Sequence, residues 1–344
     1  MRTCLVLGSA GFIGRHMVRE LESRGYEVWQ SDIAHDPSAP MYGNYYHDAL
    51  DVFGKITRVF DLIIHAAYHV GGRAAIDGVN TNFAKNLQLD AAMFEWAVRT
   101  KQKRVLYFSS SAAYPVVYQT RSYQEAFGAL APLDNPHKWL SEDDIDLADP
   151  AEILAPDANY GWAKLTGERL AEDARRNGLH VSVVRPFSGY GEDQSLDYPF
   201  PSIVRRAASG DLSVWGPPGQ SRDWIHVDDV VRGALAVVES ETTDPVNLCT
   251  GVATEMGELA EMVFSMANCS QGIPEGCESE RGGWDLCEFC DDHEARQRKP
   301  NYLEDKPYGV FYRVGDPTRM LQYYTPRVSL EEGIRRALDV QQDL

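Results

Sequence analysis

Short apolar runs alternate with amphipathic segments through the first half of the chain. The apolar runs have the length of buried strands, and the amphipathic segments carry apolar residues three and four positions apart, as one face of a helix does. The expected strands cover residues 4–7, 27–31, 62–65, 104–109 and 181–185, and the expected helices cover residues 13–24, 86–100 and 160–177. This alternation predicts an α/β fold with a doubly wound parallel sheet.

Glycine and proline become frequent after Pro186, where residues 213–215 and 245–249 are expected to form short strands among loops. A helical pattern over residues 227–238 is expected to return to the first part of the chain. We therefore predict a first domain of residues 1–186 with about 222–240, and a smaller C-terminal α/β lobe of residues 187–221 and 241–344. The lobe carries a cysteine-rich insert at about 269–300.

Charge and hydropathy restrict the partners of this chain. The 344 residues include 33 basic and 51 acidic side chains, for a formal net charge of -18. Such a charge repels phosphate backbones and anionic lipid, so we expect neither nucleic acid nor a membrane as partner. No apolar run approaches the ~20 residues of a membrane helix, and the first residues are expected to form a strand rather than a signal peptide, so we expect a cytoplasmic protein.

A glycine-rich turn follows the first expected strand and opens the first expected helix. Gly8 allows the tight turn, Gly11 lets the backbone approach a pyrophosphate, and Gly14 lets the helix lie close to the strand. Phe12 and Ile13 complete this turn, and Asp32 ends the second strand, where a carboxylate can bind both hydroxyls of an adenosine ribose. A 2'-phosphate would be repelled by that carboxylate, so the pattern favours NAD over NADP.

Three further residues fall where cofactor contacts are expected. They are Asp48, Ala66 and Ala67. The alternative for Asp48 is an aspartate of an ordinary turn, and the alternative for the two alanines is the plain end of a strand.

Tyr160 and Lys164 stand four residues apart at the start of an expected helix, so both side chains project from one face. A nearby ammonium favours the phenolate, so we expect the pKa of Tyr160 to be lowered from its ordinary value near ~10. The pair then forms a base that can take the proton of a sugar hydroxyl as hydride leaves the same carbon. We expect Tyr160 and Lys164 to contact the cofactor as well. The spacing alone has little specificity, and its position after the serine-tipped strand at residues 107–111 supplies the rest.

The order of these motifs resembles the extended short-chain dehydrogenases/reductases, the family of nucleotide-sugar epimerases and dehydratases. The resemblance rests on residues 8–14 (GSAGFIG), 65–67 (HAA), Asn86, 108–115 (FSSSAAYP), 160–164 (YGWAK) and 221–231 (SRDWIHVDDVV). It covers nearly all of the chain outside residues 116–159 and 269–300. It implies a Rossmann-like fold, bound NAD, a nucleotide-sugar substrate and a homodimer formed through the helices at 86–100 and 160–177.

The resemblance also assigns roles to single residues. The catalytic serine or threonine of the family falls on Ser110, with Ser111 as the near alternative. The resemblance gives Arg222 and Arg313 the role of binding the nucleotide diphosphate. Arginine suits this role because its planar guanidinium binds phosphate with two parallel hydrogen bonds.

Residues 68–72 (YHVGG) and the Tyr114-Pro115 pair resemble the GDP-mannose 3,5-epimerase and GDP-fucose synthase branch. That branch adds an acid/base pair, but Ala112 occupies the cysteine position, and the partner histidine or lysine position falls near Asp193 or Asp197. Ser188 replaces the asparagine of the sugar-phosphate loop, and Ser111-Ala112 replaces the Asp-Glu pair of the dehydratases. These departures favour epimerisation at carbon 4. Net oxidation or reduction, 3,5-epimerisation, and nucleotide-sugar binding without catalysis stay open as alternatives.

Cys269, Cys277, Cys287 and Cys290 lie close together in the insert, and Cys287 and Cys290 have the spacing of a zinc knuckle. A structural zinc site formed by four thiolates would stabilise a segment that has little core of its own. The alternative is a loop with four reduced cysteines.

Overall fold

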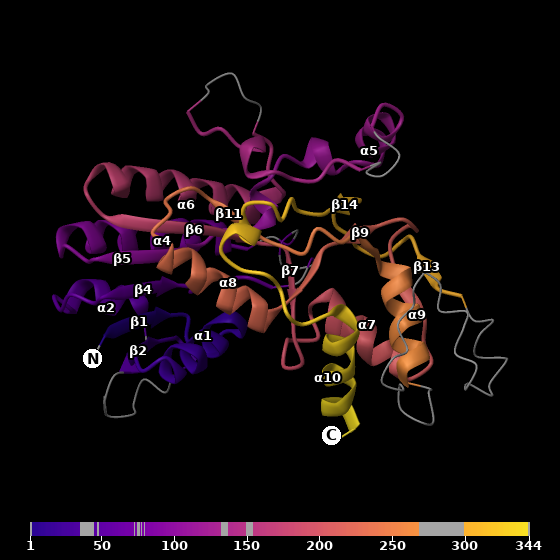
Figure 1. The fold of residues 1–344 in the computed structure, drawn as a ribbon, viewed down its shortest axis with the longest axis horizontal. Helices are drawn as coiled ribbons and strands as arrows, with labels where there is room; N and C mark the ends of the chain where they lie inside the picture. The colour runs from indigo at the N-terminus through magenta and orange to yellow at the C-terminus, as the bar shows by residue number, and fades with distance from the viewer. Residues whose placement is uncertain are drawn as a thin grey trace.

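The computed structural model describes residues 2–34, 45–46, 48–71, 73, 76, 78, 80–131, 137–148, 154–267 and 299–342. Within these ranges, seven parallel strands form a central sheet in the order β11-β6-β5-β4-β1-β2-β3 (Figure 1). They are β1 (Thr3–Leu7), β2 (Glu27–Ser31), β3 (Tyr45–Tyr46), β4 (Leu62–His65), β5 (Arg104–Phe108), β6 (His180–Pro186) and β11 (Val246–Leu248). The predicted α/β fold with a Rossmann-like parallel sheet is confirmed.

The apolar runs form strands because the sheet buries their side chains on both faces. Every residue of β1 and of β4 is buried. The strands predicted within residues 1–186 agree with the structure to within one residue at each end. The helix predicted at residues 86–100 begins earlier, at Asn82.

Helices cover both faces of this sheet (Figure 1). α1 (Phe12–Ser23) and α8 (Val227–Glu239) share an apolar core on one face. α2 (Ala49–Lys55), α4 (Asn82–Arg99) and α6 (Ala158–Arg176) share a core on the other. Within the described ranges, every helix falls short of the length and apolarity needed to cross a membrane.

β11 extends the central sheet beyond β6, with Val246 paired to Val184. Residues 245–249 are predicted among the short strands of the smaller lobe, and the structure corrects the position of this strand. The reason is that α8 runs back along the sheet, which leaves the residues that follow it beside the edge strand β6.

A second group of elements lies beyond the carboxyl ends of the strands (Figure 1). α7 (Pro199–Ala208), α9 (Met256–Ala267) and α10 (Leu330–Gln342) share an apolar core of their own. Short strands pair beside them: β7 (Ser188–Tyr190) with β10 (Trp224–His226), β8 (Ser213–Trp215) with β13 (Asn301–Leu303), and β9 (Ser221–Arg222) with β12 (Thr254–Glu255) and β14 (Tyr312–Arg313). α5 (Arg121–Gly128) follows a separate loop after β5.

The strand order changes direction at β1, because β2 lies on one side of this strand and β4 on the other. The loops that leave β1 and β4 therefore turn to opposite faces of the sheet. Such a reversal leaves a crevice at the carboxyl ends of the two strands, where open α/β sheets bind their ligands.

Candidate active site

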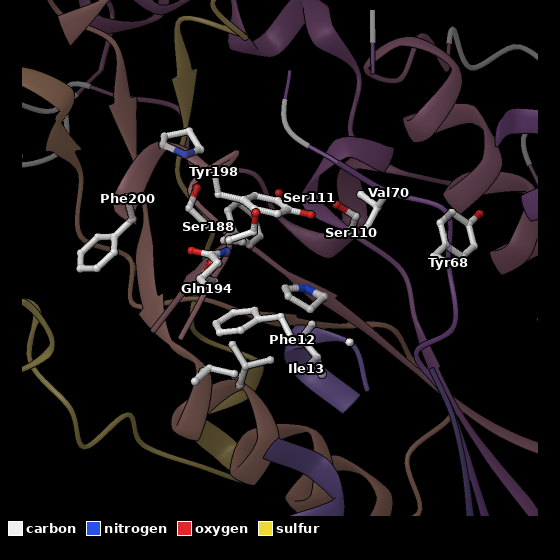
Figure 2. Close-up of a pocket in the computed structure, with 18 of the residues that line it drawn as sticks. Phe12, Ile13, Tyr68, Val70, Ser110, Ser111, Ser188, Gln194, Tyr198 and Phe200 are labelled. Carbon is white, nitrogen blue, oxygen red and sulfur yellow. The ribbon is translucent and has the colours of Figure 1, made fainter. Parts of the chain in front are cut away.

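A cavity of about 570 Å³ lies at this crevice, between the central sheet and the second group of elements (Figure 2). Phe12 and Ile13 of α1 line one side, and Ser110, Ser111 and Tyr160 line another. A second cavity of about 430 Å³ adjoins it. The residues that line both cavities are Gly71, Tyr198, Pro199, Arg222 and Met256.

The turn between β1 and α1 has the shape of a phosphate cradle. Gly8 has a φ of +81°, and a Cβ on Gly14 would lie 1.9 Å from the carbonyl oxygen of Gly8, so a larger residue fits at neither position. Gly11 caps α1 without a side-chain hydrogen bond, which leaves the first backbone N–H groups of the helix to an anion. This geometry fits the pyrophosphate of a dinucleotide.

The remaining predicted cofactor residues lie in different surroundings. Asp32 follows β2 and accepts hydrogen bonds from the backbone N–H of Ala10 and of Ala34, both at 2.9 Å. Ala66 lines the cavity, and Ala67 packs against Gly8. Asp48 caps α2 through the N–H of Leu50, at 2.9 Å, which is the ordinary turn role that the sequence analysis sets beside cofactor binding.

The start of α6 brings Tyr160 to Ser110. Ser110 precedes a short 3-10 turn, and its Oγ accepts a hydrogen bond from the N–H of Ala112 at 3.1 Å. A Cβ on Gly161 would lie 2.3 Å from the carbonyl oxygen of Ala112, so the glycine lets α6 dock against this turn. Burial raises the pKa of the Tyr160 phenol above its ordinary value, while a hydrogen bond with Ser110 lowers it in part.

Lys164 is buried below Tyr160, with its Nζ 5.9 Å from the centre of the tyrosine ring. The ammonium donates a hydrogen bond to the carbonyl oxygen of Phe108 at 2.7 Å. Burial lowers the pKa of Lys164 to about 8, against the opposing effect of Asp90 and Glu168. The predicted lowering of the Tyr160 pKa is wrong, because burial of the phenol outweighs the groups that lower its pKa.

Arg222 and Arg313 both reach the cavity, from the neighbouring strands β9 and β14. Arg222 is 8% exposed and donates hydrogen bonds to the carbonyl oxygens of Ser221 and Val310, both at 2.8 Å. Burial lowers the pKa of Arg222 to about 9, and the nearby charges of Arg313 and Arg73 add to this effect. Three cations thus gather where the two cavities meet.

Asp157 compensates part of this positive charge. Its carboxylate accepts hydrogen bonds from Arg313 at 2.9 Å and from Arg73 at 3.0 Å. Burial raises the pKa of Asp157, but the two arginines outweigh it and leave the pKa below its usual range. Sequence reasoning missed Arg73 and Asp157, because no local motif marks contacts between residues 84 and 156 positions apart.

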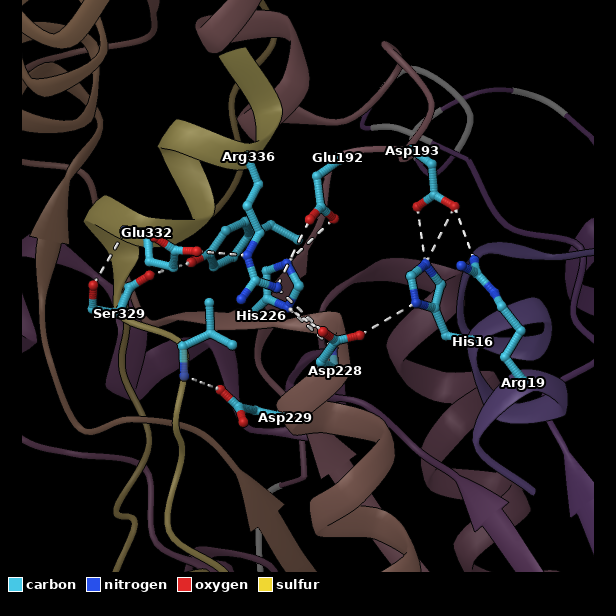
Figure 3. Close-up of polar contacts among 12 residues, drawn as sticks. His16, Arg19, Glu192, Asp193, His226, Asp228, Asp229, Ser329, Glu332 and Arg336 are labelled. Carbon is cyan, nitrogen blue, oxygen red and sulfur yellow. Dashed lines mark hydrogen bonds and ion pairs between the residues drawn. The ribbon is translucent and has the colours of Figure 1, made fainter. Parts of the chain in front are cut away.

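The residues at the family's additional acid/base positions lie apart. Ala112 is buried, and Asp197 lines the second cavity. Asp193 lines the first cavity and forms an ion pair with Arg15 at 2.6 Å. It also pairs with His16 at 3.0 Å (Figure 3). Tyr198, which sequence reasoning also missed, points into the first cavity near Ser110, as does Ser188 from β7 (Figure 2).

The predicted zinc ligands Cys269, Cys277, Cys287 and Cys290 lie outside the described residues. Within those residues, no group of three or more histidine, cysteine, aspartate or glutamate side chains is arranged to hold a metal ion.

The sequence model of the NAD dependent epimerase/dehydratase family matches residues 4–249. The chain is 29% identical to a dTDP-4-dehydro-6-deoxy-D-allose reductase of Streptomyces bikiniensis over 77% of this chain and 81% of the relative. It is 26% identical to a GDP-mannose 3,5-epimerase of Arabidopsis thaliana over 76% of this chain and 68% of the relative.

Two solved structures share the fold across nearly the whole chain. The UDP-glucose 4-epimerase of Thermotoga maritima with UDP-glucose superposes with a TM-score of 0.73 at 20% identity, and covers 99% of both chains. The UDP-glucuronic acid 4-epimerase of Bacillus cereus, in complex with UDP-glucuronic acid and NAD, gives a TM-score of 0.71 at 20% identity, with 99% of this chain and 100% of that chain covered.

Proposed function

Since this chain belongs to the NAD dependent epimerase/dehydratase family, we propose that it is a nucleotide-sugar epimerase that oxidises and re-reduces carbon 4 through a transient keto-sugar. The observation that carries the proposal is the one cavity into which the glycine-rich turn and the Ser110–Tyr160 pair both open. A sugar carbon held between them would lie close to a proton acceptor and a hydride acceptor at once.

The cofactor of this proposal is NAD, in the crevice at the carboxyl ends of β1 and β4. The backbone N–H groups at the start of α1 would hold its pyrophosphate, and Asp32 would hold the adenosine ribose. NAD bound there would supply the hydride acceptor for oxidation of the sugar and the hydride donor for its re-reduction.

Arg222, Arg313 and Arg73 hold the diphosphate of the substrate. Among the described residues, Arg222 donates hydrogen bonds only to backbone carbonyl oxygens, and Asp157 offsets only part of the positive charge around it. A diphosphate would supply further counter-charge. The second cavity then takes the nucleoside, and the first cavity takes the sugar.

Proton transfer is assigned to Tyr160, with Ser110 hydrogen-bonded to the reacting oxygen. Tyr160 removes the hydroxyl proton during oxidation and gives it back to the ketone during reduction. Lys164 supplies a positive charge that favours the phenolate.

A reductase is the second candidate, and two observations favour it. The raised pKa of Tyr160 keeps the phenol protonated, which suits an acid that donates to a ketone. One relative, at 29% identity, is itself named a reductase. Against 3,5-epimerisation, the cysteine expected beside the ketone is replaced by Ala112.

The test is incubation of the purified protein with NAD or NADH and a panel of UDP, GDP and dTDP sugars in deuterated water, followed by NMR. Epimer formation without net NADH and without deuterium in the sugar supports carbon 4 epimerisation. Stoichiometric consumption of NADH on a keto-sugar supports the reductase instead, and deuterium at carbons 3 and 5 supports the 3,5-epimerase. Binding of a nucleotide sugar without any turnover would support the remaining alternative, a protein that binds nucleotide sugars without catalysis.

A further inference from the structure

A buried carboxylate lies behind the candidate catalytic lysine. Asp90 of α4 is 0% exposed. It accepts hydrogen bonds from His65 Nε2 at 2.8 Å, from the Tyr107 hydroxyl at 2.8 Å and from the Tyr68 hydroxyl at 3.3 Å. Donors from β4, from β5 and from the loop after β4 thus meet at one side chain.

Tyr68 connects this carboxylate to Lys164. Its ring face lies under the ammonium, with Nζ 3.3 Å from the ring centre, which is close contact for a cation and an aromatic ring. Its edge meets the ring of Tyr160 at a centre-to-centre distance of 5.9 Å. Tyr68 therefore touches both the ammonium and the candidate acid/base residue, while its hydroxyl is held by Asp90. Figure 2 shows Tyr68 at one end of the cavity.

The titratable groups around Lys164 come from several elements: Asp90 of α4, Glu168 and Tyr160 of α6, Tyr107 of β5, and Tyr68. His65 of β4 contacts Asp90 rather than Lys164. Glu168 already pairs with Arg185, through hydrogen bonds of 2.9 and 2.7 Å. Among the described residues, Asp90 receives no hydrogen bond from a lysine or an arginine, and its negative charge raises the pKa of Lys164.

The close approach of α4 and α6 at this point depends on Gly167. A Cβ there would lie 1.8 Å from the Tyr107 hydroxyl and 2.7 Å from Asp90 Oδ2. Glycine therefore makes the room in which Asp90 and Tyr107 meet beside the helix that carries Lys164.

We propose that Asp90 and Tyr68 are positioning residues for Lys164: Asp90 fixes the Tyr68 phenol, and Tyr68 presents its ring to the ammonium and keeps it charged below Tyr160. The inference rests on the proposed function only in giving Lys164 a part in catalysis. Since burial alone disfavours the ammonium, loss of either partner leaves less of Lys164 protonated at neutral pH.

The experiment measures the titration of Lys164 directly, by NMR of protein labelled with ¹³Cε-lysine. The chain has eight lysines, and a Lys164→Arg variant identifies the signal. We expect wild-type Lys164 to titrate near 8. In Asp90→Asn the midpoint should fall by about one pH unit or more, because an opposite charge close to the ammonium is lost.

A second pair of variants tests the proposal if Asp90→Asn does not fold. Tyr68→Phe keeps the ring but loses the hydroxyl that Asp90 holds, so it should lower the Lys164 midpoint by less than Tyr68→Leu, which removes the ring. Asp229→Asn is the matched control, since Asp229 is also buried and bound by a tyrosine hydroxyl, at 2.6 Å, but lies in α8 on the other face of the sheet. Its Lys164 midpoint should equal that of the wild type.

An unchanged Lys164 midpoint in Asp90→Asn or in Tyr68→Leu overturns the proposal, and so does an equal fall in Asp229→Asn. Because the readout needs neither substrate nor turnover, this result is separate from the panel of nucleotide sugars. If Lys164 responds as expected while no sugar is converted, the proposed function fails and the positioning role of Asp90 and Tyr68 holds.

Discussion

A single oxygen atom of Tyr160 carries the proposed proton transfer. Tyr160→Phe keeps the ring that contacts Tyr68 but removes the hydroxyl that hydrogen-bonds with Ser110. We expect turnover to fall by about 10²-fold to 10⁴-fold, the usual range for loss of a general acid or base. NAD affinity, measured by fluorescence titration, should change little because the cradle at Gly8–Gly14 is intact. Tyr123→Phe, on α5, is the control, and full activity in Tyr160→Phe would refute the assignment.

Arg222 offers a test of the proposed diphosphate site that needs no turnover. Its charge is buried against carbonyl oxygens, so a bound diphosphate should gain a charge-assisted pair of hydrogen bonds from it. In Arg222→Met, the affinity for UDP or GDP should fall by about tenfold to a hundredfold in isothermal titration calorimetry. Arg121→Met changes an arginine that stacks on Phe311 outside both cavities and should bind like the wild type. Equal affinities in the two variants would remove Arg222 from the site.

Ion pairs join separate elements around the start of α1 (Figure 3). His16 of α1 lies 3.0 Å from Asp193 of the loop after β7 and 3.6 Å from Asp228 of α8. Its ring also meets the ring of Phe12, which lines the cavity. Burial lowers the pKa of His16, but hydrogen bonds to Asp228 and Asp193 outweigh it and raise the pKa above 6.5.

This raised pKa predicts a pH-dependent contribution to stability. A group with a raised folded-state pKa stabilises the fold fully below its unfolded value of 6.5, and that contribution is lost as the pH rises through the folded value. His16→Gln should therefore destabilise the protein more at about pH 6 than at about pH 9. The difference in the free energy of unfolding should be a few tenths to about 1 kcal/mol, and melting temperatures at the two pH values measure its direction.

His180→Gln is the control for this pH effect, since burial and the charge of Arg104 lower the pKa of His180. The contribution of His180 to the free energy of unfolding therefore has the opposite pH dependence and should not shrink as the pH rises. A gap between wild type and His16→Gln that stays constant with pH would contradict the assignment.

The sequence predicts the elements whose signal is local. β2 and β4 agree with the prediction residue for residue, and β4 is a continuously buried run. The position of β11 could not be predicted, because a strand of three residues does not encode which edge it will join. α7, α9 and α10 are absent from the predicted helices, although each carries an apolar face that packs in their shared core.

The same distinction applies to the candidate site. Ser110, Tyr160 and the glycine-rich turn belong to compact motifs, and the structure brings them to one cavity. The roles of Tyr68 and Asp90 could not be predicted, because they depend on contacts between residues of different elements. The pKa of Tyr160 was predicted in the wrong direction, since sequence spacing reports the neighbouring ammonium but not the depth of burial.

At the scale of the whole molecule, acidic side chains exceed basic ones by 18, from 51 and 33. Repulsion within such a molecule destabilises the compact state, and salt screens it over a Debye length of about 8 to 10 Å at physiological ionic strength. The melting temperature at about pH 8 should therefore rise by about 2 °C or more between about 0.02 M and about 0.3 M sodium chloride.

The control for this salt effect is pH, because the net charge vanishes near the isoelectric point of about 4.9. The same increase in salt should there leave the melting temperature nearly unchanged. Surface ion pairs such as Lys103 with Asp61 act in the opposite direction, because salt weakens them. A melting temperature that falls with salt at about pH 8 would mean that such pairs outweigh the overall repulsion. The excess of acidic side chains would then affect the solubility of the protein and not its stability.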